Sequence, residues 1–348
     1  MLHLLGRQLV GFFGPFRLLT SYLFLTGFGT ATAAALSWFL LPRLRHWLPV
    51  DQGRAFAVGA EQSAGKPVGG GIIIGVIFLV LCLLVVPLEW RFLGTLGCVL
   101  LAMVEGFLDD ASGGWNEYAL GAIDLAISVL GAVIISGLDT VRLWLPLVKA
   151  PVFVSPWVFI PLATALVWLT INATNCTDGV DGLSATLLSL AFVYLGGILY
   201  GVVGHQEIAQ YLLVPHYADG ADWAMMAFVM TGCLAGYLWH NSYPSIVLMG
   251  DAGSRPMGFL LAMLVLASGN PFLVFVVAGV VLVNGATGLL KVALLRFFNI
   301  GIFRHVRYPL HDHVRQKGAW SNTQVLVRFA LLQALGTPLL LVLLLKVR

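Results

Sequence analysis

Residues 172–183 read Asn-Ala-Thr-Asn-Cys-Thr-Asp-Gly-Val-Asp-Gly-Leu, and they follow an apolar run, residues 156–172, that contains no charged side chain. Asp178 and Asp181 each precede a glycine, and Leu183 begins the next apolar run. Asp and Gly are common in ordinary tight turns, which is the simplest interpretation of the pair. The alternative is a membrane-spanning helix that ends at two carboxylates, and the rest of the chain decides between them.

The composition is typical of a membrane protein. Of the 348 residues, 59% are hydrophobic and 10% are charged, whereas soluble domains carry roughly 25% charged residues. The mean hydropathy is +0.93. The apolar runs are long and continuous rather than short and alternating, which favours a helical bundle over a barrel. The net charge of +3 does not indicate a nucleic-acid partner. We therefore expect an all-α polytopic membrane protein.

Ten apolar segments predict about ten transmembrane helices. The segments are residues 19–41, 71–88, 91–108, 118–138, 156–172, 183–203, 223–240, 256–269, 271–295 and 324–345. The ninth is expected to bend near Asn284-Gly285. The sequence has no internal repeat and no soluble region large enough to fold alone, so residues 1–348 are interpreted as one integral membrane domain. Ten crossings would place both termini on the same side.

Lys and Arg are distributed unevenly between the two sides of the membrane. One side has twelve, namely Arg43, Arg45, Arg54, Lys66, Arg255, Lys291, Arg296, Arg304, Arg307, Arg315, Lys317 and Arg328. The other has seven, namely Arg7, Arg17, Arg91, Arg142, Lys149, Lys346 and Arg348. Cytoplasmic loops carry the excess of basic residues, so the first side is predicted to be cytoplasmic and both termini to lie outside.

Two segments on the outer side have features of their own. Residues 1–17 contain Arg7 and a short apolar run without a cleavage site, so we expect them to be retained rather than removed as a signal peptide. Residues 140–155 alternate apolar and polar side chains around Leu147 to Pro151. This pattern predicts a small β-hairpin that caps the outer surface.

Two further acidic motifs fall on the predicted cytoplasmic side. Asp109-Asp110 ends the third segment, and Gly250-Asp251 follows the seventh. A solvated helix end and a short turn are the simple interpretations. Adjacent carboxylates at a membrane surface repel each other, however, unless a cation or a proton offsets their charge. Because these acids share one side with Asp178 and Asp181, they predict a Mg²⁺ site made of oxygen ligands.

The loop before the last segment carries His311-Asp312-His313 among several basic residues. Alone, this loop is explained by the cytoplasmic excess of Lys and Arg and by attraction to anionic lipid headgroups. Next to a Mg²⁺ site, the same basic residues and histidines could bind the rest of an anionic substrate. The combination favours phosphoryl transfer that involves a lipid phosphate.

Together these motifs resemble the polyprenyl-phosphate N-acetylhexosamine-1-phosphate transferases, and within that superfamily the phospho-N-acetylmuramoyl-pentapeptide transferases, which form lipid I. The resemblance extends over nearly the whole chain. Its matching segments are residues 65–70, 108–110, 172–183, 241–254, 308–313, 317–320 and 325–329. It implies ten helices with both termini outside, an active site on the cytoplasmic face and a location in the bacterial inner membrane.

The resemblance also implies a reaction. Undecaprenyl phosphate would attack the β-phosphate of UDP-MurNAc-pentapeptide and give lipid I and UMP, as a step of peptidoglycan synthesis. Mg²⁺ is the implied cofactor. The implied partners are the lipid substrate and the lipids of the membrane around the protein. The resemblance also suggests a homodimer.

The matching motifs imply roles for individual residues. Catalytic roles are expected for Asp109, Asp110, Asp178, His311 and His313. Asp251, together with Asp109, is expected to bind the metal. Substrate binding is expected at Lys66, Asn172, Asn175, Asp181, Asn241, Leu248, Gly250 and Asp312.

Four positions depart from the family pattern. Asp312 replaces the middle member of a histidine triplet. Lys66 begins a segment that replaces Thr-Pro-Thr-Met-Gly-Gly, and the resemblance implies that it substitutes for a lysine that the family has slightly upstream. Leu248 stands where an aromatic side chain packs on uracil, so it offers apolar contact without stacking. Val314-Arg315 replaces Phe-Glu. These departures leave the sugar and the uridine affinity open.

Three alternatives follow. The first is a sister transferase that uses UDP-GlcNAc or another UDP-sugar with a polyprenyl phosphate. The second is an ion-coupled transporter, which predicts carboxylates near the middle of the helices and inverted repeats. The third is a relative that binds lipid without turnover. The position of the acids at segment ends favours an enzyme over the transporter.

Overall fold

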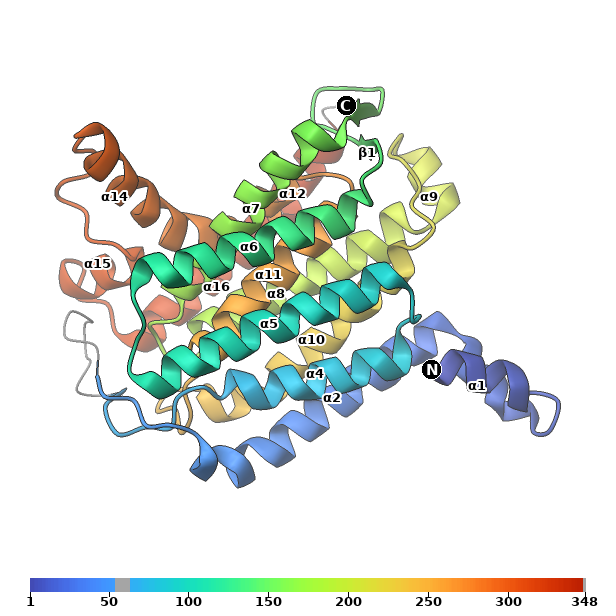
Figure 1. The fold of residues 1–348 in the computed structure, drawn as a ribbon, viewed down its shortest axis with the longest axis horizontal. Coiled ribbons are helices and arrows are strands. Elements are labelled where there is room, and N and C mark those ends of the chain that lie inside the picture. The colour runs from blue at the N-terminus through green and yellow to red at the C-terminus, as the bar shows by residue number, and fades with distance from the viewer. Residues whose placement is uncertain (54–62, 347–348) are drawn as a thin grey trace.

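The computed structural model describes residues 1–53 and 63–346, so Arg54 and Arg348 of the charge distribution lie outside the described residues. Within the described part the regular elements are helices, apart from one two-stranded sheet (Figure 1). Eight helical segments have the length and composition to cross a membrane. They are Tyr22–Trp47, Trp90–Ser112, Glu117–Ser136, Pro156–Thr177, Leu183–Val203, Gly220–Asn241, Gly279–Phe298 and Asn322–Leu345. The chain is therefore a polytopic helical membrane protein, as the composition predicts.

These segments correspond to labelled elements of Figure 1. They are α2 (Tyr22–Leu44) with η2 (Arg45–Trp47), α5 (Trp90–Ser112), α6 (Glu117–Ser136), α7 (Pro156–Thr177), α8 (Leu183–Ile198) with η3 (Leu199–Val203), α10 (Gly220–Asn241), α13 (Gly279–Val281) with η4 (Leu282–Ala286) and α14 (Thr287–Phe298), and α16 (Asn322–Lys346).

Two of the predicted segments form shorter helices. The segment 71–88 becomes α4 (Gly71–Val85), which has 15 residues and ends before Val86 because the residue preceding a proline favours an extended backbone. The segment 256–269 becomes part of α11 (Asp251–Ala267), which has 17 residues. Every residue from Asp251 to Leu266 is buried, and α11 packs against α4, α5, α7 and α8. It is the central helix of the bundle (Figure 1).

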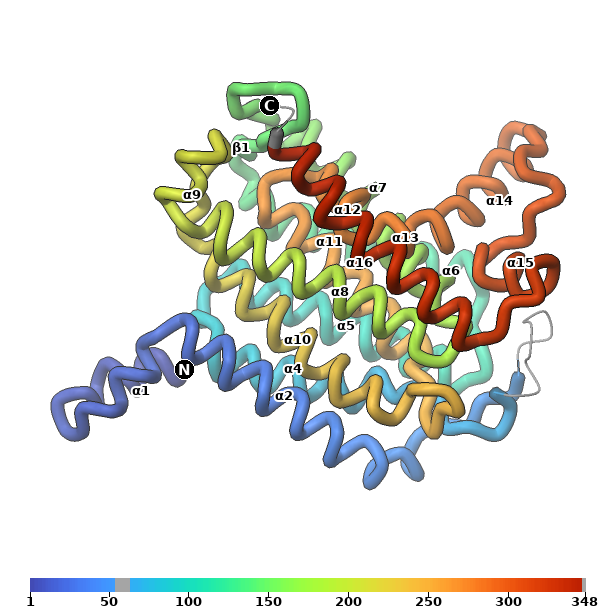
Figure 2. Tube along the Cα trace, turned by 180° about the vertical axis from the view of Figure 1, so that it is seen from behind, coloured from blue at the N-terminus to red at the C-terminus, as the bar shows by residue number. Residues whose placement is uncertain are grey.

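The ninth predicted segment, 271–295, is broken rather than continuous. It divides into α12 (Leu273–Val277), the short α13, the π-helical η4 and α14. The expected bend near Asn284-Gly285 is therefore confirmed, and a π-helical turn is a common cause of such a bend. Beyond it, α14 leans away from the bundle and contains no buried residue (Figures 1 and 2).

Small residues bring the long helices close together. Gly232 and Gly236, one turn apart on α10, lie against the backbone of α2, since an added Cβ would come within 2.2 Å of the Thr30 oxygen and 2.4 Å of the Ala34 oxygen. Close backbone approach at such spaced small residues stabilises helix pairs in membranes, where the hydrophobic effect cannot.

One end of the bundle carries the N-terminus and the end of α16 (Asn322–Lys346) (Figures 1 and 2). The Met1 amino group donates to the Leu84 oxygen at 3.0 Å, beside the end of α4. The same end carries α9 (Gln206–Tyr211) and the predicted β-hairpin, in which β1 (Val141–Leu143) pairs antiparallel with β2 (Val152–Val154). Here too α1 (Leu2–Leu9) and η1 (Gly14–Thr20) project sideways. The opposite end carries α15 (Leu310–Gln316).

Candidate active site

The acidic motifs gather at the end of the bundle opposite the termini. Helix α5 begins at Trp90, close behind the end of α4 where Met1 is bound, and runs for 23 residues. At 1.5 Å per residue this places its end about 34 Å away. Asp109 and Asp110 lie in its last turn, Asp178 follows the end of α7, and Asp251 begins α11.

Asp110 caps the start of α11. Its Oδ1 accepts the N–H of Asp251 and its Oδ2 accepts the N–H of Ala252, both at 3.0 Å. The first N–H groups of a helix have no partner within the helix and carry a partial positive charge. A carboxylate stabilises them both by accepting their hydrogen bonds and by its negative charge. Gly250 allows this approach: it has φ +70°, and a Cβ there would lie 2.3 Å from Asp110 Oδ2. Gly250, which the sequence predicts to bind substrate, is thus required here by local geometry.

Asp109 also has a backbone partner. Its Oδ1 accepts the N–H of Trp115 at 2.5 Å, which holds the turn that follows α5. The side chain is nearly buried, with an exposed fraction of 7%. The hydrogen bonds at Asp109 and Asp110 offset the repulsion between the two adjacent carboxylates.

Asp251 belongs to a buried charge network. Arg255, one turn later on α11, donates from Nε to Asp251 Oδ2 at 2.9 Å. Its Nη1 donates to Asp124 Oδ2 at 2.6 Å and lies 3.8 Å from Glu105 Oε1. Sequence reasoning missed Arg255, Asp124 and Glu105 as part of the site. A signal was present, since Asp124 and Glu105 are isolated acids in apolar segments and such acids need a partner in the membrane.

Two asparagines of α7 bind side chains of the neighbouring helices α6 and α11. Asn172 Nδ2 lies 3.3 Å from Asp124 Oδ2 and 2.9 Å from the Trp168 oxygen. One turn later, Asn175 Nδ2 donates to Ser254 Oγ at 3.1 Å. Both predicted binding residues therefore position α7 against α6 and α11 in the structure.

Lys66 and Asp181 connect two loops far apart in sequence. Lys66 Nζ lies 3.5 Å from Asp181 Oδ2 and donates to Ser245 Oγ at 3.0 Å. Asp181 accepts both the N–H and the hydroxyl of Ser245, at 3.0 and 2.8 Å. Lys66, at a position where the chain departs from the family pattern, is therefore brought to the Asp178–Asp181 turn.

Asn241 and Leu248 hold the loop between α10 and α11. Asn241 Oδ1 accepts the N–H of Gly182 at 2.8 Å, and its Nδ2 donates to the Val247 oxygen at 2.9 Å. Leu248 pairs through its backbone, donating to the Pro67 oxygen at 2.8 Å and accepting from Gly70 N–H at 2.9 Å. Its side chain is half-buried.

His311 is brought against the same turn. A Cβ on Gly179 would lie 2.5 Å from His311 Nε2, so the imidazole covers this glycine directly. The His311 N–H donates to Asn284 Oδ1 at 2.8 Å, and Asn284 Nδ2 donates to Thr177 Oγ1 at 3.1 Å. Burial, and to a smaller extent the charge of Arg315, lower the pKa of His311 to about 3, so the ring is neutral at neutral pH. The bend at Asn284 is thus also where His311 is anchored, a role the sequence did not reveal.

The other two members of the triplet face basic groups. Asp312 Oδ1 lies 3.4 Å from Arg315 Nη1, and its Oδ2 lies 3.8 Å from Arg307 Nε. His313 Nδ1 accepts the N–H of Arg307 at 3.2 Å. A neutral His313 would therefore carry its proton on Nε2 and could donate it in a hydrogen bond. The carboxylate of Asp312 is balanced by two arginines rather than exposed.

The arrangement contains oxygen donors suited to Mg²⁺. Among residues 1–53 and 63–346, no group of three or more His, Cys, Asp or Glu side chains could hold a metal ion. Mg²⁺ commonly binds one or two carboxylates, several waters and the phosphates of a substrate rather than a complete protein cage. The carboxylates of Asp251 and Asp109 at helix ends fit a site of that kind.

A family model and several curated proteins are similar to this chain. The model of glycosyl transferase family 4 matches residues 92–269, from α5 to the end of α11. The phospho-N-acetylmuramoyl-pentapeptide-transferase of Treponema pallidum (strain Nichols) is 48% identical over 341 residues, covering 97% of this chain and 94% of the relative. The enzyme of the same name from Helicobacter pylori is 31% identical over 353 residues, covering 93% and 95%. That of Nautilia profundicola is 29% identical over 330 residues, covering 89% and 91%.

Proposed function

We propose a function from one premise: this chain belongs to glycosyl transferase family 4. It transfers phospho-MurNAc-pentapeptide from UDP-MurNAc-pentapeptide to undecaprenyl phosphate, giving lipid I and UMP for peptidoglycan synthesis. The observation that carries this proposal is 48% identity, over 97% of the chain, to transferases that bear this name. The family match also favours an enzyme over an ion-coupled transporter.

The reaction exchanges one phosphoanhydride for another. An oxygen of undecaprenyl phosphate attacks the β-phosphorus of the UDP-sugar, the bond from that phosphorus to the bridging oxygen breaks, and UMP leaves with the bond electrons. Mg²⁺, held by Asp251 and Asp109 together with substrate phosphates, would neutralise part of the charge that develops on the phosphate oxygens. Asp109 and Asp178 are the candidates for accepting a proton from the lipid phosphate.

The chain's other residues act mainly by positioning. Asp110 fixes the first turn of α11, and with it the backbone of Asp251. His311 and His313 are proposed to contact the phosphates and the sugar, His311 in its neutral form. Positioning and electrostatic stabilisation supply most of the rate enhancement in phosphoryl transfer.

The nucleotide is proposed to bind between the α7–α8 turn and the loop that precedes α11. Asp181 lies on that turn and Lys66 binds to it, Asn175 lies in the last turn of α7 and binds Ser254 of α11, and Leu248 offers uracil an apolar contact. Gly250, Asn241 and Asn172 shape the walls, and Asp312 keeps the arginines of the histidine loop in place.

We propose that the ten helical segments all cross the membrane, with both termini outside and the site on the cytoplasmic face of a bacterial inner membrane. Two observations support this topology. The N-terminus and the end of α16 lie at one end of the bundle and the acidic motifs at the other (Figure 1). Twelve of the nineteen Lys and Arg residues fall on the acidic side of the predicted topology. Assembly as a homodimer is proposed from the family resemblance.

The experiment measures UMP release by purified protein with undecaprenyl phosphate, Mg²⁺ and a panel of UDP-sugars. We expect release with UDP-MurNAc-pentapeptide and far less with UDP-GlcNAc. Activity with UDP-GlcNAc alone would show that the departures at Asp312, Lys66 and Leu248 have changed the sugar. Chelation of Mg²⁺ should stop release, and its restoration should recover it.

A further inference from the structure

A helical hairpin at the terminal end of the bundle has no part in the proposed reaction. It consists of α1 and η1 and projects sideways from the bundle (Figures 1 and 2). Gly6 closes the hairpin, because a Cβ at that position would lie 2.8 Å from Leu19 Cβ. The hairpin is at the opposite end from Asp109 and Asp251, so whatever it binds is distinct from the transferase site.

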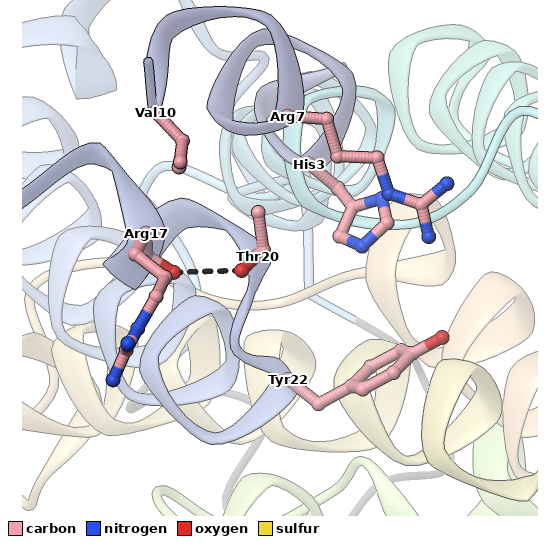
Figure 3. Close-up of a pocket in the computed structure, with 6 residues that line it drawn as sticks. All are labelled: His3, Arg7, Val10, Arg17, Thr20 and Tyr22. Atoms are coloured by element: carbon pink, nitrogen blue, oxygen red, sulfur yellow. Dashed lines mark hydrogen bonds between the residues drawn. The ribbon is translucent and has the colours of Figure 1, made fainter. Parts of the chain in front are cut away.

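The hairpin and the start of α2 line a cavity of about 500 Å³ that is open to the surroundings (Figure 3). This volume is within the range of small-ligand sites. The lining residues are His3, Arg7, Val10, Arg17, Thr20 and Tyr22. Thr20 Oγ1 donates to the Arg17 oxygen at 2.7 Å and orders that wall, and the rings of His3 and Tyr22 stack with centroids 6.2 Å apart.

The cavity is cationic. Residues 1–50 contain no Asp or Glu. Arg7 and Arg17 are exposed, and within the described part of the chain neither has a carboxylate within 4.0 Å of its guanidinium. Burial lowers the pKa of His3, and the charge of Arg7 lowers it further, so the positive charge of the cavity comes from the two arginines rather than from this histidine. Asp222 and Glu89 interact electrostatically with Tyr22, so that side of the cavity is the less positive one.

The hairpin that carries the two arginines also exposes large apolar side chains. Phe12, at the tip of the hairpin, has an exposed fraction of 89%, and Phe13 and Leu18 have 57% and 53%. Large aromatic and aliphatic side chains beside arginines are typical of elements that lie in the membrane interface, where the apolar face enters the acyl chains and the cations meet the headgroups. The hairpin extends sideways from the end of the bundle that carries the N-terminus (Figure 1).

We propose that this cavity binds the phosphate headgroup of an anionic phospholipid in the leaflet at the terminal end. Arg7 and Arg17 contact the phosphate, for which the planar guanidinium is well suited. Phe12, Phe13 and Leu18 lie along the acyl chains of the same lipid. The lipid would then hold a hairpin whose own contacts with the bundle are few, and it would fix the N-terminal end of α2.

The test compares lipid binding in wild-type protein, in the Arg7→Gln/Arg17→Gln double variant and in a matched control. Arg91→Gln is the control, because Arg91 begins α5 at the same end of the bundle and does not line the cavity. Native mass spectrometry of the detergent-purified protein measures bound phosphatidylglycerol against phosphatidylcholine. A basic residue near an anionic surface contributes about 1 kcal/mol, so the double variant should bind phosphatidylglycerol about 30-fold more weakly.

The control should change by less than about threefold, and the single variants should each lose about fivefold. Unchanged selectivity for phosphatidylglycerol in the double variant would overturn the proposal. An equal loss of phosphatidylcholine would also overturn it, because the hairpin would then be an apolar anchor without a headgroup site. Displacement of phosphatidylglycerol by millimolar inorganic phosphate would identify a free-phosphate site instead. If the double variant unfolds at a lower temperature than the wild-type protein, the binding of phosphatidylglycerol and phosphatidylcholine is compared in the single variants instead.

Discussion

Asp110→Asn tests how the site is held together, because it removes a charge and one acceptor while keeping the size of the side chain. The carboxylate accepts the N–H groups of Asp251 and Ala252, both at 3.0 Å. An asparagine can accept only one of them and turns an NH₂ group toward the other. A buried N–H left unsatisfied costs about 1–3 kcal/mol, and losing the anion at the start of a helix costs about 0.3–1 kcal/mol. The sum is about 1.3–4 kcal/mol.

The assay has two readouts on purified protein. Thermal unfolding should show the midpoint lowered by at least about 3 °C, since 1 kcal/mol shifts it by roughly 2–4 °C in domains of 150–250 residues. Turnover measured below that midpoint should fall on the order of 10–100-fold, because Asp251 begins the displaced turn. Asp139→Asn is the matched control, since Asp139 is exposed at the other end of the bundle. A wild-type midpoint would refute the capping role, and normal turnover with a lowered midpoint would refute the positioning of Asp251.

Three other substitutions test separate parts of the structure. Arg255→Met leaves buried carboxylates at Asp251 and Asp124 without their cation and should destabilise the protein by about 3–5 kcal/mol, measured by chemical unfolding; an unchanged midpoint would contradict the network. His311→Asn tests pH dependence: the folded pKa is about 3 against an ordinary 6.5, so the unfolded chain binds a proton first and stability falls from about pH 6.5 toward pH 3. The stability of the variant should fall less over this pH range, and a pH profile of stability identical to that of the wild-type protein would contradict a buried neutral ring. Lys66→Met should change stability by less than about 1 kcal/mol, because the pair is partly exposed. It should raise the KM for the UDP-sugar, whereas an unchanged KM would exclude Lys66 from the nucleotide site.

The arrangement of helices could be predicted because each apolar run is a local property of the chain. Seven of the ten predicted segments became single long helices, and the ninth became the long helical stretch Gly279–Phe298 preceded by the short α12, with the expected bend near Asn284. Hydropathy did not predict that α4 would stop at Val85 or that α11 would start at Asp251, ahead of its apolar run. The start of α11 depends on a cap from another helix, which no local pattern of α11 contains.

The predicted site residues do share one end of the bundle, yet their partners could not be read from the sequence. Arg255 joins Asp124 from α6 and Glu105 from α5, and this pairing depends on how three helices pack. Asp109 and Asp110 look alike in sequence, but one binds the turn after its own helix and the other binds α11. Such roles follow from tertiary contacts between segments far apart in the chain.

The most direct test of the central claim is UMP release by the purified protein supplied with Mg²⁺, undecaprenyl phosphate and UDP-MurNAc-pentapeptide, with Asp251→Ala measured alongside. We expect release by the wild-type protein and none by the folded variant. Absence of release by folded wild-type protein, or equal release by both proteins, would contradict a phospho-MurNAc-pentapeptide transfer site at the start of α11.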